Sequence, residues 1–346
     1  MDSIMLLSMG ASMAAVVFLL TIPTRALALR IGFVAHPTSR SSHDRPTPLG
    51  GGVAFVVPVT MAWLTLAFVF SDSVLMATAI LGLALAVMGH FADRRRVGPT
   101  SRLLVQAIAS VSLAMLVLWN DRNWDPIGSP ILVLAAALAL TWSTNVFNFM
   151  DGLDGLATTE SLFVTLAGIT IASVTGADTG FLLSLAALAG GLIGFLPWNA
   201  PRARIFMGDV GSTWLGFCLA ALALQDSARM PSLLPVWLIL PALFVVDASV
   251  CLIRRAIQRE NVMAGHRAHA YQNLSRLLSS HGKVVWAFTA ANLALLPAVW
   301  FSVEAPTWGW TMFGLVYGVA IAAAVVGRSG VHGVADPATR QSIGIR

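Results

Sequence analysis

Residues 131–147 read ILVLAAALALTWSTNVF and run directly into Asn148-Phe-Met-Asp151-Gly-Leu-Asp154-Gly. A membrane-spanning helix needs roughly 20 predominantly apolar residues, and this stretch supplies most of them before polar residues begin. Carboxylates at a membrane surface are costly and therefore indicate a function. Two carboxylates three residues apart share one face if the segment is helical, and paired carboxylates are typical ligands of Mg²⁺ or polar substrates. The alternative interpretation is a helix end followed by an ordinary Asp-Gly turn.

The rest of the chain has the same apolar character. Of 346 residues, 57% are hydrophobic and 11% are charged, against roughly 25% charged residues in soluble domains. We therefore predict a single all-α polytopic integral membrane domain over residues 1–346, with about eleven transmembrane helices. Few apolar runs alternate as strands do, which disfavours a β-barrel. The candidate spans are residues 4–22, 50–70, 74–91, 103–119, 131–147, 157–174, 180–197, 212–225, 232–253, 284–302 and 309–327.

The positive charges predict the orientation. If the N-terminus is periplasmic, all 21 Lys and Arg residues except Arg122 and Arg229 fall on the cytoplasmic side, as does the C-terminus. The net charge of +5 then describes one face of the protein, which would meet anionic lipid or an anionic substrate. We expect no nucleic-acid partner, because the chain has no basic, aromatic soluble domain.

Two further features bear on topology and redox state. Only Asp2 precedes the first apolar run, and the positive charges follow that run, so we expect an uncleaved anchor rather than a signal peptide. Cys218 and Cys251 both fall within candidate spans, so no disulfide is expected.

Nearly all the unusual chemistry lies in the predicted cytoplasmic loops, near residues 24–49, 92–102, 148–156, 197–212 and 254–283. In the first loop, His43 and Arg45 precede prolines and three glycines, which suits either a substrate loop or a juxtamembrane linker. In the second, Asp93 stands beside an arginine run and ahead of Arg102, which suits an anion site or a surface ion pair.

The later loops carry a second set of candidates. Asp209 stands between glycines just before a predicted helix, with Arg204 nearby, so it is either an N-cap or a metal-holding carboxylate next to a phosphate site. His266, Arg267 and His269 form a cationic cluster that suits a diphosphate or a sugar, or simply faces solvent. A zinc site is weakly supported, because the His-x-x-His pattern contains no cysteine.

Two acids lie inside predicted spans rather than in loops. Asp247 and Glu160 are expected to have structural or supporting roles, with partners on neighbouring helices.

Taken together, these loops place acidic residues, cations and glycine turns on one membrane face. That combination is typical of a Mg²⁺–diphosphate site. It predicts a nucleotide-sugar donor from the cytoplasm and a lipid-phosphate acceptor at the membrane edge, with Mg²⁺ stabilising a departing nucleotide monophosphate.

Three motifs resemble a known family. Asn145…Asn148…Asp151-Gly-Leu-Asp154-Gly, Phe206-Met-Gly-Asp209-Val-Gly-Ser and His266-Arg-Ala-His269 are similar to those of polyprenyl-phosphate N-acetylhexosamine-1-phosphate transferases of the glycosyltransferase family 4 type. The resemblance covers about residues 36–302. The His266-Arg-Ala-His-Ala-Tyr-Gln form is most similar to the bacterial branch that starts O-antigen or related lipopolysaccharide synthesis.

The resemblance implies the transfer of N-acetylhexosamine-1-phosphate from a UDP-sugar to undecaprenyl phosphate, with Mg²⁺ or Mn²⁺ as cofactor and a homodimer as the assembly. It implies that Asp209 and Asp151 hold the metal, that Asn148 and Asp154 lie at the nucleotide, and that Phe206 lies against the uracil. His266, Arg267 and His269 would hold the diphosphate or sugar. The supporting predictions are a catalytic role for Asp93 and substrate contacts from His43, Arg45, Arg102, Asn145 and Arg204.

One position departs from the family pattern. The family usually has adjacent aspartates in the second cytoplasmic loop, and here that pair is Ala92-Asp93, in register with Arg102 and Gln106. The departure leaves a catalytically impaired relative as an alternative. A transporter of an anionic lipid or nucleotide sugar is the other, although transporters place polar groups near the bilayer midplane. Neither the identity of the sugar nor the choice between direct attack and a covalent intermediate follows from the sequence.

Overall fold

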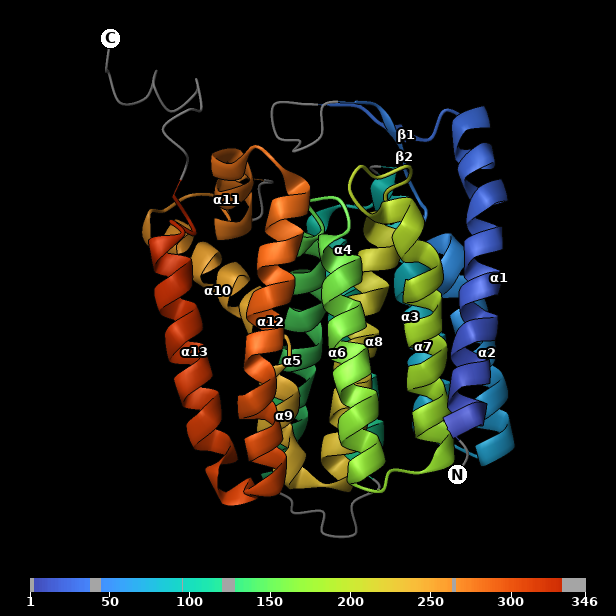
Figure 1. Ribbon diagram of the computed structural model, residues 1–346, viewed down its shortest axis with the longest axis vertical. Helices are drawn as coiled ribbons and strands as arrows, with labels where there is room; N and C mark the ends of the chain where they lie inside the picture. Colours follow the sequence, from blue (N-terminus) through green and yellow to red (C-terminus); the bar gives the residue numbers. More distant parts are fainter. Residues whose placement is uncertain (1–2, 38–44, 95, 120–127, 263–265, 332–346) are drawn as a thin grey trace.

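Long helices run side by side through the whole molecule (Figure 1), in a computed structural model that describes residues 3–37, 45–94, 96–119, 128–262 and 266–331. The prediction of an all-α polytopic membrane protein is confirmed. In chain order the elements are α1 (Ser3–Arg30), β1 (Val34–Ala35), β2 (Thr47–Pro48), α2 (Val53–Phe70), α3 (Ser73–Asp93), α4 (Pro99–Trp119), α5 (Gly128–Met150), α6 (Leu156–Val174), α7 (Thr179–Asn199), α8 (Gly208–Arg229), η1 (Pro231–Leu233), α9 (Leu234–Ile239), α10 (Ala242–Ile257), α11 (Ala270–Leu278), α12 (His281–Glu304), η2 (Pro306–Trp308) and α13 (Gly309–Val326).

The number of spans differs slightly from the expected eleven. Within the described residues, nine helices are long and apolar enough to cross a membrane, and there are ten if the bent pair of η1–α9 with α10 counts as one span. The predicted span 212–225 corresponds to α8, which does not belong to this set although its 22 residues reach roughly 33 Å. Because α8 is surrounded by protein rather than lipid, it can carry Asp209, Asp226 and Arg229.

The predicted span 232–253 is broken. The segments Pro231–Ile239 and Ala242–Ile257 meet at 70°. Pro241 stands at the break, where a proline cannot donate the backbone hydrogen bond that a continuous helix requires. The bend directs α10 toward α11, a nine-residue helix within residues 254–283, which were predicted to form a loop.

The first helix is longer than the predicted span 4–22, because the apolar sequence continues past Pro23 as far as Arg30. Arg25 therefore projects from the helix, and its Nε donates to the Arg204 carbonyl at 3.1 Å. Beyond α1, β1 and β2 form a short antiparallel ladder, with Val34 opposite Pro48. This ladder, which the sequence did not predict, carries the chain back to Leu49.

Helices α7 and α8 form the centre of the bundle. The spanning part of α7 is 83% buried, whereas that of α1 is 17% buried. Trp214 of α8 is fully buried and stacks on Trp63 of α2, with ring centroids 5.3 Å apart. The Trp63 indole in turn donates to the Ser184 carbonyl of α7 at 2.9 Å. These contacts hold the first turn of α8 in a fixed place at one end of the bundle.

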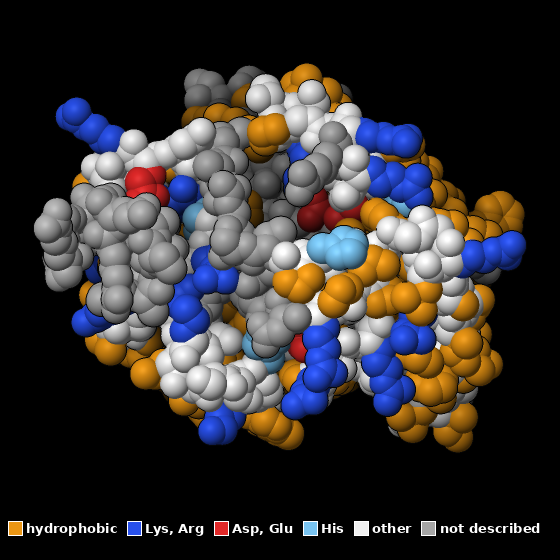
Figure 2. Space-filling model, turned by 90° about the horizontal axis from the view of Figure 1, so that it is seen from above, with side chains coloured by type: hydrophobic (Ala, Val, Ile, Leu, Met, Phe, Trp, Pro, Cys, Tyr) orange, Lys and Arg blue, Asp and Glu red, His pale blue; other side chains and the backbone are white. Residues whose placement is uncertain are grey.

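That end of the bundle collects the polar connections. The α5–α6 and α7–α8 loops and α11 lie at the end opposite the start of α1 (Figure 1). Viewed onto that face, Lys and Arg side chains are spread across the surface, and acidic side chains are visible in a hollow (Figure 2). Cys218 and Cys251 are free and buried, which confirms that they form no disulfide.

Candidate active site

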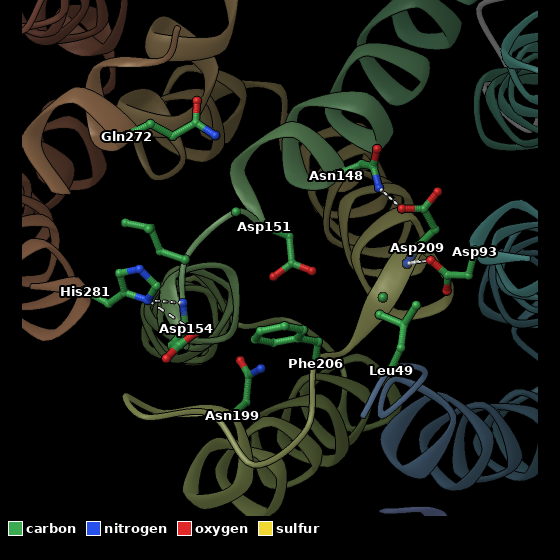
Figure 3. A pocket seen from close by; sticks show the side chains of 13 residues that line it. Leu49, Asp93, Asn148, Asp151, Asp154, Asn199, Phe206, Asp209, Gln272 and His281 are labelled. Carbon is green, nitrogen blue, oxygen red and sulfur yellow. Dashed lines mark hydrogen bonds and ion pairs between the residues drawn. The ribbon is translucent and has the colours of Figure 1, made fainter. Parts of the chain in front are cut away.

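A cavity of about 230 Å³ opens at the polar end of the bundle. It brings together residues from six helices and three connections (Figure 3). Its lining consists of Leu49, Asp93, Asn148, Asp151, Gly152, Leu153, Asp154, Asn199, Phe206, Gly208, Asp209, Gln272 and His281.

Asp209, in the first turn of α8, bonds through both of its carboxylate oxygens to side chains of neighbouring helices. Its Oδ2 pairs with Arg102 Nη2 at 2.9 Å, and its Oδ1 accepts from Asn148 Nδ2 at 2.7 Å. Asn148 also donates to Ser212 Oγ at 3.1 Å and accepts from Arg102 at 3.3 Å. A carboxylate oxygen retains a further lone pair after accepting one hydrogen bond, so Asp209 can still bind a cation.

Asp93 reaches the same point from the end of α3. Its Oδ1 accepts the backbone N–H of Asp209 at 3.0 Å, so it occupies the positive end of α8. Its Oδ2 is buried and has no hydrogen-bond partner among the described residues. Gly208 makes this approach possible: its φ is +72°, and a Cβ there would lie 2.6 Å from Asp93 Oδ2.

Asp151 lies between Asp209 and Asp154, and its carboxylate points into the cavity (Figure 3). Burial, followed by the charges of Asp209, Asp93 and Asp154, raises the pKa of Asp151 well above its usual range. A cation in the cavity would oppose each of these effects.

Asp154 has a more structural place. Its Oδ2 accepts the backbone N–H of Ala203 at 3.0 Å, and its Oδ1 lies 3.3 Å from His281 Nδ1. The carboxylate therefore joins the α5–α6 loop to the α7–α8 loop and to the start of α12. These bonds hold in place the wall of the cavity that lies opposite Asp209.

Helix α11 closes another side of the cavity. Tyr271 donates through its hydroxyl to the Phe149 carbonyl at 2.9 Å, while its neighbour Gln272 lines the cavity. Gly152 leaves room for this packing, because a Cβ there would lie 2.1 Å from the Tyr271 hydroxyl. The conformation of the Asp-Gly-Leu-Asp-Gly loop thus depends on α11.

The structure gathers six of the predicted site residues into the cavity lining and places Arg102 in contact with two of them. The six are Asp93, Asn148, Asp151, Asp154, Phe206 and Asp209.

The other predicted residues do not line the cavity. Asn145 donates to Gln106 Oε1 and to the Thr141 carbonyl, both at 2.8 Å, and the Arg204 guanidinium lies over the Trp198 ring at 5.7 Å. Arg45 is exposed beside β2. His43, the other residue predicted in the first loop, lies outside the described residues.

His266, Arg267 and His269 lie beside the cavity. Arg267 accepts from Arg276 through its carbonyl, and the His266 and His269 rings stack with centroids 4.8 Å apart. Burial, and then the nearby Arg255, lower the pKa of His269 to about 4, so this imidazole is neutral at pH 7. The roles predicted for these residues toward the diphosphate stay predictions.

Sequence reasoning did not single out Leu49, Asn199, Gln272 or His281 as site residues. Gln272 belongs to the histidine motif and follows Tyr271, so the motif could have indicated it as a site residue. His281 is the first residue of a spanning helix whose N-cap is Ser280, which makes it resemble an ordinary helix start. Their contribution depends on how α11 and α12 pack, which the local sequence does not encode.

The donor set suits a hard divalent cation. Four carboxylates and three side-chain amides line the cavity, and Mg²⁺ prefers oxygen ligands. The unpartnered buried Asp93 Oδ2 and the raised pKa of Asp151 are the features that a bound cation would relieve. The residues present therefore fit Mg²⁺, with Asp209, Asp151 and Asp93 as its nearest carboxylates.

The residues around this cavity match a known protein family. The model of glycosyl transferase family 4 matches residues 74–226, which include Asp93, Asp151, Asp154 and Asp209. The chain is 31% identical to the decaprenyl-phosphate N-acetylglucosaminephosphotransferase of Mycobacterium tuberculosis, over 80% of this chain and 77% of the relative.

Two other relatives extend the comparison. The chain is 27% identical to a Bacillus subtilis protein named probable undecaprenyl-phosphate N-acetylglucosaminyl 1-phosphate transferase, over 77% of this chain and 76% of the relative. It is 32% identical to the phospho-N-acetylmuramoyl-pentapeptide-transferase of Heliobacterium modesticaldum, over 77% of this chain and 87% of the relative.

Proposed function

Because the chain belongs to glycosyl transferase family 4, among the polyprenyl-phosphate N-acetylhexosamine-1-phosphate transferases, we propose that it acts on a UDP-N-acetylhexosamine and undecaprenyl phosphate. The products are undecaprenyl-diphospho-N-acetylhexosamine and UMP. The observation that carries the proposal is the meeting of Asp93, Asp151, Asp154, Asp209 and Asn148 in one cavity at the polar end of a membrane bundle.

The relatives and the charge distribution support the finer assignments. The names of the mycobacterial and Bacillus subtilis relatives favour N-acetylglucosamine as the sugar. The histidine motif favours the initiation of O-antigen or another surface polysaccharide. The spread of Lys and Arg across the surface that holds the cavity favours the cytoplasmic face of the inner membrane, where UDP-sugars are made.

The protein side chains position the two substrates. Phe206 presents an aromatic ring to the cavity, which suits stacking on the uracil base. Asn148 is held by Arg102, Asp209 and Ser212, so its amide has one orientation at the nucleotide. Asp154 keeps the wall opposite Asp209 in place through Ala203 and His281.

The overall reaction exchanges one phosphorus–oxygen bond for another. A bond forms between an oxygen of undecaprenyl phosphate and the phosphorus that bears the sugar, while the bond from that phosphorus to the UMP oxygen breaks. Mg²⁺ held by Asp209, Asp151 and Asp93 would neutralise the diphosphate and stabilise the departing UMP. Arg102, which pairs with Asp209, adds a positive charge at the same place.

Release of UMP by the purified protein tests the proposal. The reaction contains undecaprenyl phosphate, Mg²⁺ and one donor from a panel that includes UDP-GlcNAc, UDP-GalNAc and 6-deoxy analogues, with EDTA as the metal control. Asp209→Asn should lose most activity, whereas Asp178→Asn, which changes an N-cap at the far end of the bundle, should retain it. The absence of lipid-dependent UMP release with every donor would contradict the proposal.

A further inference from the structure

A second cluster of side chains with metal-binding donors lies next to the cavity and does not line it. Cys251 projects from α10, and His266 and His269 stand on the segment that leads into α11. One donor atom from each residue lies within 4.8 Å of the other two. No sequence pattern groups the cysteine with the histidines, because it precedes them by 15 and 18 residues and lies in a predicted span.

The spacing is close to that of a metal-binding site. Cys251 Sγ lies 3.9 Å from His266 Nδ1. Ligands at 2.0–2.3 Å from a tetrahedral Zn²⁺ are roughly 3.3–3.8 Å from one another. The three donors would therefore need to move by about 1 Å or less, which side-chain rotation can provide.

His269 supplies an independent indication of a ligand. Its residue exposure is 3%, and its Nδ1 makes no regular hydrogen bond among the described residues, although the side chain faces the Gln272 backbone N–H at the start of α11. The nearest carboxylate atom, Asp247 Oδ1, is 3.9 Å away, which is too far for a hydrogen bond. A buried nitrogen without a regular hydrogen bond is costly, and a neutral imidazole nitrogen is a good zinc ligand.

The surrounding charges are compatible with a cation. Asp247 brings a carboxylate to the cluster, where its oxygens accept the N–H groups of Ala270 at 2.8 Å and Tyr271 at 3.1 Å. Arg255 is the opposing charge in the vicinity. Its Nε pairs with Glu260 Oε2 at 2.7 Å, which offsets much of its repulsion.

We propose that Cys251, His266 and His269 bind one divalent cation of the zinc class. On binding, the Cys251 thiol loses its proton to solvent and the thiolate becomes a ligand. The cation would join α10 to the segment before α11, the helix that places Gln272 in the cavity. This site is distinct from the all-oxygen site proposed for Mg²⁺, and it gives the two histidines a metal rather than a diphosphate as their partner.

Metal content and a cobalt spectrum test the proposal without any transferase substrate. The full-length protein is purified with a tag that contains no histidine, and zinc is measured by mass spectrometry after exhaustive dialysis. Cys218→Ser is the matched control, because Cys218 is also fully buried but lies in α8, away from the histidine cluster.

We expect about one zinc per chain in the wild type and in Cys218→Ser, and at least a roughly ten-fold weaker affinity in Cys251→Ser. Replacement of zinc by Co²⁺ should give a thiolate-to-cobalt absorption band that Cys251→Ser lacks. His269→Gln, which should also lose the metal, serves if Cys251→Ser does not fold.

A wild-type protein without stoichiometric metal, or a cobalt complex without a thiolate band, would overturn the assignment. Equal metal retention in Cys251→Ser or His269→Gln would overturn it too. Because the readout is metal content, failure of this site and failure of the transferase proposal are separate results.

Discussion

Replacement of Asn148 by leucine removes the amide that connects Asp209 to Arg102 and Ser212, while keeping a side chain of similar size. Three hydrogen bonds are lost, at 2.7, 3.1 and 3.3 Å. The strongest is made to a carboxylate, and bonds to charged groups contribute roughly 1.5–3 kcal/mol. The Arg102 pair with Asp209 remains, since it does not involve Asn148.

If this contact holds Asp209 in its working position during the reaction, its loss should lower kcat/KM by about 10- to 150-fold. The side chains of Arg102 and Asp209 are 24% and 25% exposed, so solvent compensates in part and the lower half of that range is expected. The assay is UMP release at fixed undecaprenyl phosphate with a varied donor concentration. Thermal unfolding and gel filtration establish that each variant is folded.

Asn145→Leu is the matched control, one turn earlier on α5. Its amide bonds only to neutral groups, Gln106 Oε1 and the Thr141 carbonyl. We expect a loss of stability of about 1–2 kcal/mol with kcat/KM within about three-fold of the wild type. A folded Asn148→Leu protein with wild-type kcat/KM would refute the role of this contact, and an equal loss in Asn145→Leu would restore Asn145 as a substrate contact.

Three further changes address the cation and the backbone around the cavity. EDTA should abolish UMP release, and Asp151→Asn should raise the Mg²⁺ concentration for half-maximal rate by about ten-fold, because one carboxylate ligand is lost; an unchanged Mg²⁺ dependence would exclude Asp151 as a ligand. Gly208→Ala should destabilise the fold by about 1–2 kcal/mol through its φ of +72° and its contact with Asp93, as measured by thermal unfolding, whereas Gly318→Ala, inside α13 with no atom within 4 Å of the added Cβ, should not destabilise it. Ala92→Asp should raise the rate of UMP release by restoring the usual pair of carboxylates, and a rate that stays the same or falls would contradict this expectation.

The site residues that the sequence could predict are those that lie at the ends of predicted membrane spans. Asp151 and Asp154 follow one span, and Asp209 precedes another, so their arrival at one end of the bundle follows from topology alone. Asp93 ends α3 at the same level for the same reason. The polar motif and the positive-inside pattern were therefore sufficient to bring these four carboxylates together.

The parts that sequence could not predict depend on contacts between distant segments. Helix α11 has only nine residues, too few for stability on its own, and Asp247 of α10 caps its first amides. Ser329 locks that carboxylate from the other side, through a hydroxyl bond at 3.0 Å to the Asp247 carbonyl and a second to its side chain. The intramembrane acid thus has the structural role that its position suggested, but its partners lie 23 and 82 residues away.

Glu160 has a comparable place in α6. It is 1% exposed, and its Oε2 accepts from the Asn292 amide of α12. Polar groups on facing helices pair in this way inside a bundle. The pairing fixes α12, whose first residue, His281, then reaches Asp154 at the cavity.

The electrostatic balance of the cavity determines what can enter it. Its carboxylates stand at the starts of α6 and α8, where unpaired backbone amides offset part of their charge; the Asp209 N–H bonded to Asp93 is one such amide. Among the described residues, Arg102 is the Arg or Lys side chain that pairs with one of them. One guanidinium and two helix ends do not balance the carboxylates, an excess of negative charge that contributes to the raised pKa of Asp151, so a free diphosphate would meet net repulsion. A diphosphate that carries Mg²⁺ would reverse the sign of that interaction, which favours entry of the UDP-sugar as its metal complex and explains why an acidic cavity can serve an anionic donor.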